Sequence, residues 1–195
     1  YLTRLLIPLA VEQLLLMTVG MADTMMVTTA GESVVSGVSL VDNINILIIN
    51  IFAALSTGGA VVVAQYLGRR EQENARSAAK QLLYVALLAS VSLMAAALLF
   101  REPILRMLFG SISQEVMDSA LIYFLLTAAA YPFIAIYNAG AALFRAMGNS
   151  KVSMVNSFIV NLINIAVNAL LIYGFDMGAA GAGLGTLTSR MAAAV

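Results

Sequence analysis

The sequence has 195 residues and contains neither cysteine nor histidine. The absence of cysteine excludes disulfides, thiolate metal sites and cysteine nucleophiles. The absence of histidine removes the side chain that most often carries a proton near neutral pH. Any proton chemistry in this chain must therefore use carboxylates.

Charged residues are also scarce: they make up 10% of the chain, against 62% hydrophobic residues and a net charge of zero. Soluble domains carry about 25% charged residues. A large soluble helical core would still need polar outer faces, which are missing here. Long runs have no charged residue, namely 43–68, 81–100, 119–144 and 152–175. A helix of about 20 residues crosses the hydrocarbon layer, so each run predicts a membrane span.

The predicted fold is an all-α polytopic membrane bundle, which we expect to be a single unit over 1–195. Six transmembrane helices are expected at about 5–29, 34–67, 77–100, 119–143, 152–173 and 178–195. The sixth is short, so we expect the chain to be a fragment of a longer protein. The mixed apolar and charged segment 101–118 predicts a short helix in the membrane interface.

The distribution of lysine and arginine predicts the orientation. With the N-terminus in the cytoplasm, seven basic residues fall inside and two outside. The inside set is Arg4, Arg69, Arg70, Arg76, Lys80, Arg145 and Lys151, and the outside set is Arg101 and Arg106. The positive-inside rule therefore predicts a multi-pass plasma-membrane protein with a cytoplasmic N-terminus. We expect the lipid bilayer, and no nucleic acid, among its partners.

Asp23 lies in the outer half of the first predicted span, in the stretch VGMADTMMV. A charged side chain at such a depth costs up to about 2.5–3.5 kcal/mol unless it is neutralised, paired or solvated. Hydrogen bonding to a neighbouring helix is the structural alternative, but intramembrane acids are typical of functional sites. Glu12 lies on the same helix face, about 16 Å nearer the cytoplasm. It is either a second cavity acid, or a group near the inner interface or paired with Arg190.

A polar stripe runs along the fifth predicted span. Ser157, Asn161, Asn164 and Asn168 are spaced so that they share one helix face. Such amides can hold neighbouring helices together. Four polar residues in one line, however, indicate the wall of a wet cavity.

Small and flexible residues surround these polar groups. The glycine-rich segment 178–190 allows close helix packing and presents the hydroxyls of Thr186 and Thr188, beside the intramembrane Arg190. A methionine cluster surrounds Asp23 and fits either adaptable ligand binding or plain core filling; its members are Met17, Met21, Met25 and Met26. Pro8 and Gly20 are places where the first helix can bend.

The chain resembles the multidrug and toxic compound extrusion (MATE) family of cation-coupled antiporters. The resemblance rests on several features in order: Pro8 with GMADTMMV, then VAQYLGRR, FRAMGNSK, NLINIAVNALLIYG and the glycine-rich start of the sixth helix. It implies one six-helix lobe of a twelve-helix, two-lobed transporter, with the C-terminal lobe missing. The implied activity is export of organic, cationic or amphipathic compounds in exchange for H⁺ or Na⁺.

The resemblance also implies roles for individual residues. Asp23 would bind the coupling ion with Asn164, Asn168 and Thr186, which are all oxygen ligands suited to Na⁺. Some relatives carry a second acid where this chain has Asn168, so the choice between Na⁺ and H⁺ stays open. The candidates for the substrate cavity are Glu12, Met17, Gly20, Asn161 and Arg190, and the helix-bending candidate is Pro8. We expect no cofactor beyond the coupling ion.

Three alternatives compete with the antiporter. A flippase for lipid-linked oligosaccharides would need Arg and Lys for pyrophosphate, and only Arg190 qualifies. A membrane-embedded enzyme would need a catalytic pattern such as HExxH, GxSxG or DDxxD, and the sequence has none of these, so we do not expect an enzyme. A scaffold subunit would explain the amide stripe but leaves Asp23 without a role.

Overall fold

The computed structural model describes residues 2–194, without the side chains of residues 2–6, 8, 9 and 16. Within this range the chain is helical and contains no β-strand. The helices are α1 (Leu2–Thr28), α2 (Glu32–Gly68), α3 (Gln72–Leu99), α4 (Arg101–Phe109), α5 (Gln114–Ala129), α6 (Tyr131–Ala146), α7 (Ser150–Ala169), the π-helical turn η1 (Leu170–Gly174) and α8 (Gly178–Ala193). The predicted all-α bundle is confirmed.

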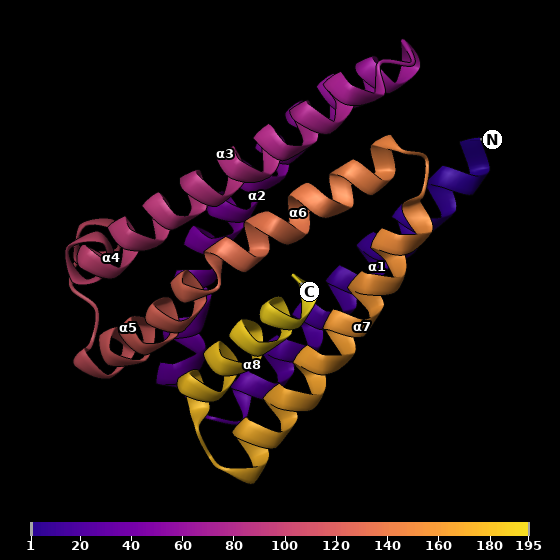
Figure 1. The fold of residues 1–195 in the computed structure, drawn as a ribbon. Helices are drawn as coiled ribbons and strands as arrows, with labels where there is room; N and C mark the ends of the chain where they lie inside the picture. The colour runs from indigo at the N-terminus through magenta and orange to yellow at the C-terminus, as the bar shows by residue number, and fades with distance from the viewer. Residues whose placement is uncertain (1, 195) are drawn as a thin grey trace.

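The helices form two groups that meet around α8 (Figure 1). The long helices α2 and α3 lie side by side and pack on α5 and α6, whereas α1 packs along α7. Helix α8 contacts both α7 and α5 and so joins the groups. Helix α1 contacts α2 far less than it contacts α7.

The single helix predicted over 119–143 is instead two helices, α5 and α6, which meet at Ala130 with a bend of 46°. Pro132 lies in the first turn of α6. Proline has no backbone N–H, so the carbonyl four residues earlier loses its helical hydrogen bond and the helix breaks. Sequence analysis missed this break because the apolar run continues across it.

Other helix bounds differ less from the prediction. The expected short helix is α4, which stops before Gly110, where φ is +63°. Residues 114–118 belong to the start of α5 rather than to that short helix. Helix α7 ends in the π-helical turn η1, so the fifth predicted span is confirmed with an irregular last turn.

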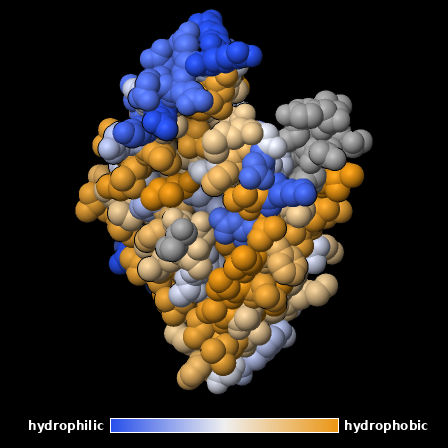
Figure 2. Space-filling model, turned by 45° about the vertical axis from the view of Figure 1, so that its right-hand side comes forward, coloured by the Kyte–Doolittle hydropathy of each residue, from blue (hydrophilic) through white to orange (hydrophobic). Residues whose placement is uncertain are grey.

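Four of the described helices are long and apolar enough to cross a membrane, and the bent α5–α6 pair makes a fifth if it is counted as one span. Helix α8 has 16 residues, which corresponds to a length of about 24 Å, less than the hydrocarbon layer. Apolar residues form a broad band on the visible face, and hydrophilic residues gather at one end (Figure 2). The surface is therefore that of a membrane protein.

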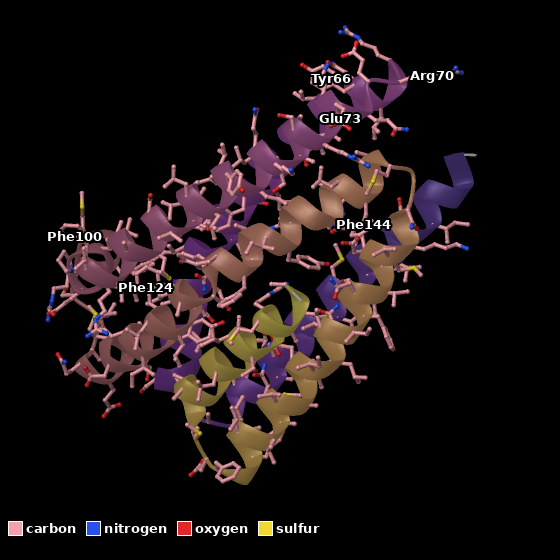
Figure 3. All side chains as sticks on the ribbon, in the orientation of Figure 1. Tyr66, Arg70, Glu73, Phe100, Phe124 and Phe144 are labelled. Atoms are coloured by element: carbon pink, nitrogen blue, oxygen red, sulfur yellow. The ribbon has the colours of Figure 1, made fainter. Side chains whose placement is uncertain are left out.

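The connections between helices gather at two ends. Tyr66, Arg70 and Glu73 mark the α2–α3 end, and Phe100 marks the opposite end of α3 (Figure 3). The α6–α7 connection lies near the α2–α3 end, and the α1–α2 and α7–α8 connections lie together at the other (Figure 1). A Cβ atom at Gly178 would lie 3.7 Å from Val34, which shows how closely those two connections approach.

Candidate ion and substrate site

Asp23 is held by two amides of α7. The Nδ2 of Asn168 donates to Oδ1 of Asp23 at 2.7 Å. The amide nitrogen of Asn164 is placed to donate to both carboxylate oxygens, at 3.0 and 3.1 Å, the orientation that matches donors to acceptors. The amide stripe therefore reaches Asp23, at the distance that a shared site requires.

These partners are neutral. Among the described side chains, no Lys or Arg nitrogen lies within 4.0 Å of the Asp23 carboxylate. Asn168 is 1% exposed, and its Oδ1 has no hydrogen-bond partner among the described groups. This oxygen lies against Gly185 of α8, in the space that a Cβ there would fill. A carboxylate with only neutral partners inside a membrane span calls for a proton or a cation.

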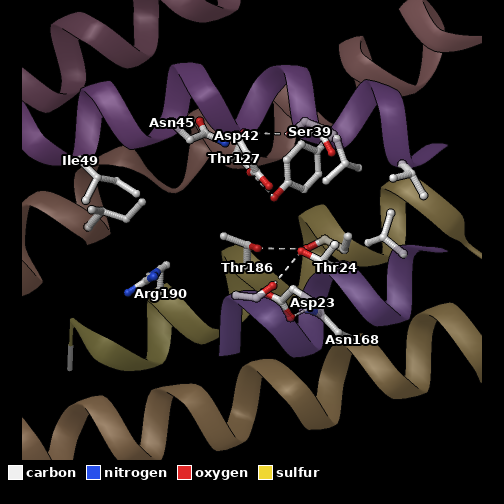
Figure 4. Close-up of a pocket in the computed structure, with 17 residues that line it drawn as sticks. Asp23, Thr24, Ser39, Asp42, Asn45, Ile49, Thr127, Asn168, Thr186 and Arg190 are labelled. Atoms are coloured by element: carbon white, nitrogen blue, oxygen red, sulfur yellow. Dashed lines mark hydrogen bonds between the residues drawn. The ribbon is translucent and has the colours of Figure 1, made fainter. Parts of the chain in front are cut away.

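Asp23 borders a cavity of about 170 Å³. The cavity lies between α1 and α2, with walls from α5, α7 and α8 (Figure 4). Its polar lining consists of Asp23, Thr24, Ser39, Asp42, Asn45, Tyr123, Thr127, Asn168, Thr186 and Arg190. The polar groups that converge here make this the candidate site of the described chain.

Asp42 is a cavity acid that the sequence analysis did not single out. It lies on α2, across the cavity from Asp23 (Figure 4). Its Oδ1 accepts a hydrogen bond from the hydroxyl of Tyr123 at 2.9 Å. Asp42 is the only residue in 34–67 that is charged at neutral pH, the same signal that identified Asp23. Ser39 and Asn45, each three residues away, place further polar groups on that face.

Two of the residues expected on α8 lie at the cavity. Thr186 and Arg190 both line it, one helical turn apart. The hydroxyl of Thr186 donates to the carbonyl of Ala182 at 3.1 Å, which leaves its lone pairs free for a ligand. Asn161, also expected there, is buried on α7 outside the cavity lining, and its Nδ2 lacks a partner among the described groups.

Glu12 is not a cavity acid, and its partner is Arg145 rather than Arg190. Its Oε2 lies 3.5 Å from an Arg145 nitrogen and accepts from the Ser153 hydroxyl at 2.6 Å. Glu12 is 6% exposed, so this pair is a buried contact between α1, α6 and α7. Helical periodicity places Glu12 on the same face of α1 as Asp23. Its distance from Asp23 along the helix axis keeps it out of the cavity lining.

Met17 lies outside the polar cavity, on an apolar groove along α1. The groove is lined by Met17, Gly20, Met21, Thr24, Met25 and Thr28. Gly20 and Thr24 also line the polar cavity, so the two spaces adjoin. Met17 is 65% exposed, which excludes a core-filling role within this chain. The side chain of Pro8 lies outside the described residues.

Comparisons with known proteins identify the family of this chain. The sequence model of the MatE family matches residues 8–170. The chain belongs to the MatE family. The similar proteins include an uncharacterised transporter, YisQ, of Bacillus subtilis, 29% identical over 94% of the chain. A probable multidrug resistance protein NorM of Thermotoga maritima is 27% identical over 99% of the chain.

Solved structures confirm the fold of this MatE chain. A MOP superfamily transporter from Pyrococcus furiosus superposes with a TM-score of 0.93 at 24% identity, covering 98% of this chain and 42% of that one. The chain also spans 41% and 42% of the lengths of the YisQ and NorM relatives. The matching region is thus about the size of one lobe of these transporters.

Proposed function

We propose that this MatE chain is the N-terminal lobe of a secondary active antiporter that exports organic compounds in exchange for H⁺ or Na⁺. The observation that carries the proposal is Asp23, a carboxylate with neutral amide partners beside a polar cavity within the spans. An exchanged cation or proton neutralises such a group, and its departure restores the charge. That cycle lets ion movement drive a change of conformation.

The oxygen atoms around Asp23 can hold either coupling ion, Na⁺ or H⁺. Na⁺ is a hard cation that prefers oxygen ligands. The Asp23 carboxylate, the Thr186 hydroxyl and the unpaired Oδ1 of Asn168 are oxygens near the cavity, and Asn164 would supply another once its amide turns. A proton would neutralise the same carboxylate. Protonation and Na⁺ binding therefore compete for one residue, with no histidine needed.

The apolar methionine groove favours cationic or amphipathic organic substrates. Flexible thioethers adapt to varied apolar shapes. The groove adjoins the acidic cavity through Gly20 and Thr24, so a compound with an apolar body and a positive group would contact both. The NorM relative and the PmpM relative of Pseudomonas aeruginosa are named multidrug resistance proteins. A second lobe would cover this groove and complete the substrate cleft.

The proposed setting is the plasma membrane, crossed several times, with the N-terminus in the cytoplasm. Seven basic residues at one set of connections against two at the other support this orientation. Transport would proceed by rocking of two lobes around the site.

Transport by the purified full-length protein in liposomes tests the proposal. Vesicles loaded with ethidium should lose it faster when an external Na⁺ or H⁺ gradient is imposed, and a separate run for each ion identifies which one couples. Collapsing the gradient with an ionophore should lower the rate of ethidium loss to that of ethidium-loaded liposomes without the protein. Equal loss with and without both gradients would rule out antiport.

A further inference from the structure

Three charged side chains line the polar cavity: Asp23 from α1, Asp42 from α2 and Arg190 from α8. The remaining walls contribute Tyr123 and Thr127 from α5, Ile134 from α6 and Asn168 from α7, which carry no charge near neutral pH. The described lining thus has two negative charges and one positive charge. A net charge left uncompensated inside a membrane is costly, so the cavity lacks one positive charge.

Asp42 has no local counter-charge. Its described partner is the neutral Tyr123 hydroxyl, at 2.9 Å. The nearby Asn45 accepts a hydrogen bond from Tyr131 at 3.0 Å. Within the described part of the chain, no Lys or Arg nitrogen lies within 4.0 Å of the carboxylate. The charge of Asp42 must therefore be balanced by a positive group across the cavity or by a bound cation.

Arg190 is available to balance one of the two carboxylates. It forms no ion pair within 4.0 Å with any described acid. Glu12, the other acid of α1, already has Arg145 at 3.5 Å. Because Arg190 lies one turn from Thr186 on the cavity side of α8, its long side chain lies at one end of the space between Asp23 and Asp42 (Figure 4).

We propose that Asp42 and Arg190 fix the number of external cations that this cavity takes. Arg190 acts as a built-in cation that balances one carboxylate, so Asp23 and Asp42 together take one monovalent cation, a proton or Na⁺. This inference rests on the proposed ion coupling at Asp23 and adds the residues that set its stoichiometry. Neither residue needs to touch the exported compound.

The charge count makes distinct predictions for three variants. Asp42→Asn leaves one carboxylate and one guanidinium, so the cavity is balanced without an external cation. Arg190→Gln leaves two carboxylates and takes two cations. The double variant Asp42→Asn with Arg190→Gln leaves one carboxylate and again takes one. Because Asn retains an oxygen that can accept the Tyr123 hydrogen bond, Asp42→Asn removes charge and preserves that contact.

Cation binding to the full-length protein in lipid nanodiscs tests the proposal. Binding of ²²Na⁺ at alkaline pH and proton uptake in Na⁺-free buffer measure the two ions separately. We expect Asp42→Asn to weaken binding to this lobe by about 10-fold or more, within the usual range of couplings between charged sites. The cation affinity of the double variant should return to within about threefold of the wild-type value. The Arg190→Gln protein should bind one cation more than wild type.

Asp118→Asn is the matched control. It removes one acid of the same lobe from an exposed position on α5, where Asp118 contacts Gln114, and it should bind like wild type. The proposal is overturned if the double variant stays as weak as Asp42→Asn, or if Arg190→Gln binds no additional cation. A wild-type protein that binds neither ion would instead contradict the proposed coupling itself.

Discussion

The two acids of α1 have partners of different kinds, and this difference separates their proposed roles. Glu12 has a guanidinium at 3.5 Å and a serine hydroxyl at 2.6 Å, both from other helices. Asp23 has amide donors and a cavity. A charged partner makes Glu12 a structural contact between helices, whereas Asp23, whose partners are neutral, is the residue that we propose exchanges a cation.

The structural role of Glu12 predicts a loss of stability on truncation. Glu12→Ala leaves the Ser153 hydroxyl without its acceptor and removes the carboxylate partner of Arg145, and a hydrogen bond to a charged group contributes about 1.5–3 kcal/mol. We expect the free energy of unfolding to fall by about this amount. Gln13→Ala, at the exposed neighbouring position, is the control. Thermal unfolding in detergent measures both, and equal melting temperatures would contradict the assignment.

At the residue scale, the sequence predicted the proximity of Asp23, Asn164 and Asn168 because helical periodicity fixes which residues share a face. It could not identify the partner of Glu12, since that pairing depends on how α6 packs against α1. Asp42 carried the same sequence signal as Asp23. Because Asp42 directly precedes the uncharged run 43–68, the charge pattern alone places it at the edge of a span rather than inside one.

Glycine residues allow close contacts between the helices around the site. Gly37 of α2 lies against the backbone of α5, where a Cβ atom would come within 2.9 Å of the Ala120 nitrogen. Gly58, on the same helix, has nothing within 4 Å of that position. The α2–α5 contact holds Asp42 beside Tyr123, so the packing of these helices shapes one wall of the cavity.

Alanine at these two glycines should have opposite effects. Gly37→Ala forces α2 away from α5 and should destabilise the protein by about 1–3 kcal/mol, as overpacking does. Gly58→Ala should be neutral or stabilising by up to about 1 kcal/mol, because alanine is the better helix former. Melting temperatures of the two variants measured in the same detergent decide this. A Gly37→Ala protein as stable as wild type would mean that α2 and α5 pack less closely.

At the element scale, apolar runs predicted nearly every helix, because the length of a span is set by the bilayer. The break at Ala130 was not predicted. A proline within an apolar run can leave a span continuous or split it, and the choice depends on whether neighbouring helices accept the bend. The π-helical end of α7 was not predicted either, and its segment LLIYG contains no proline to mark it.

In the molecule as a whole, the connections between helices lie at two opposite ends. This arrangement supports the predicted topology. The α2–α3 and α6–α7 connections lie at one end and the α1–α2 and α7–α8 connections at the other (Figure 1). The basic residues Arg69, Arg70 and Arg145 lie near the first end. The positive-inside rule predicts that this end lies in the cytoplasm.

Cysteine labelling tests this orientation directly, since the chain has no cysteine of its own. A cysteine at Gln72 should react with a membrane-impermeant maleimide only after the cells are opened. A cysteine at Asp176, in the α7–α8 connection, should react in intact cells. The reverse pattern would overturn the orientation and move the cavity to the opposite half of the membrane.

Efflux by Asp23→Asn tests the central claim, that this carboxylate couples ion movement to export. The amide keeps the size of the side chain but cannot cycle its charge. In the full-length protein, Asp23→Asn should reach the membrane in normal amounts, yet cells that make it should accumulate ethidium like cells without the transporter. Ethidium efflux at wild-type rate, still driven by a Na⁺ or pH gradient, would contradict the account.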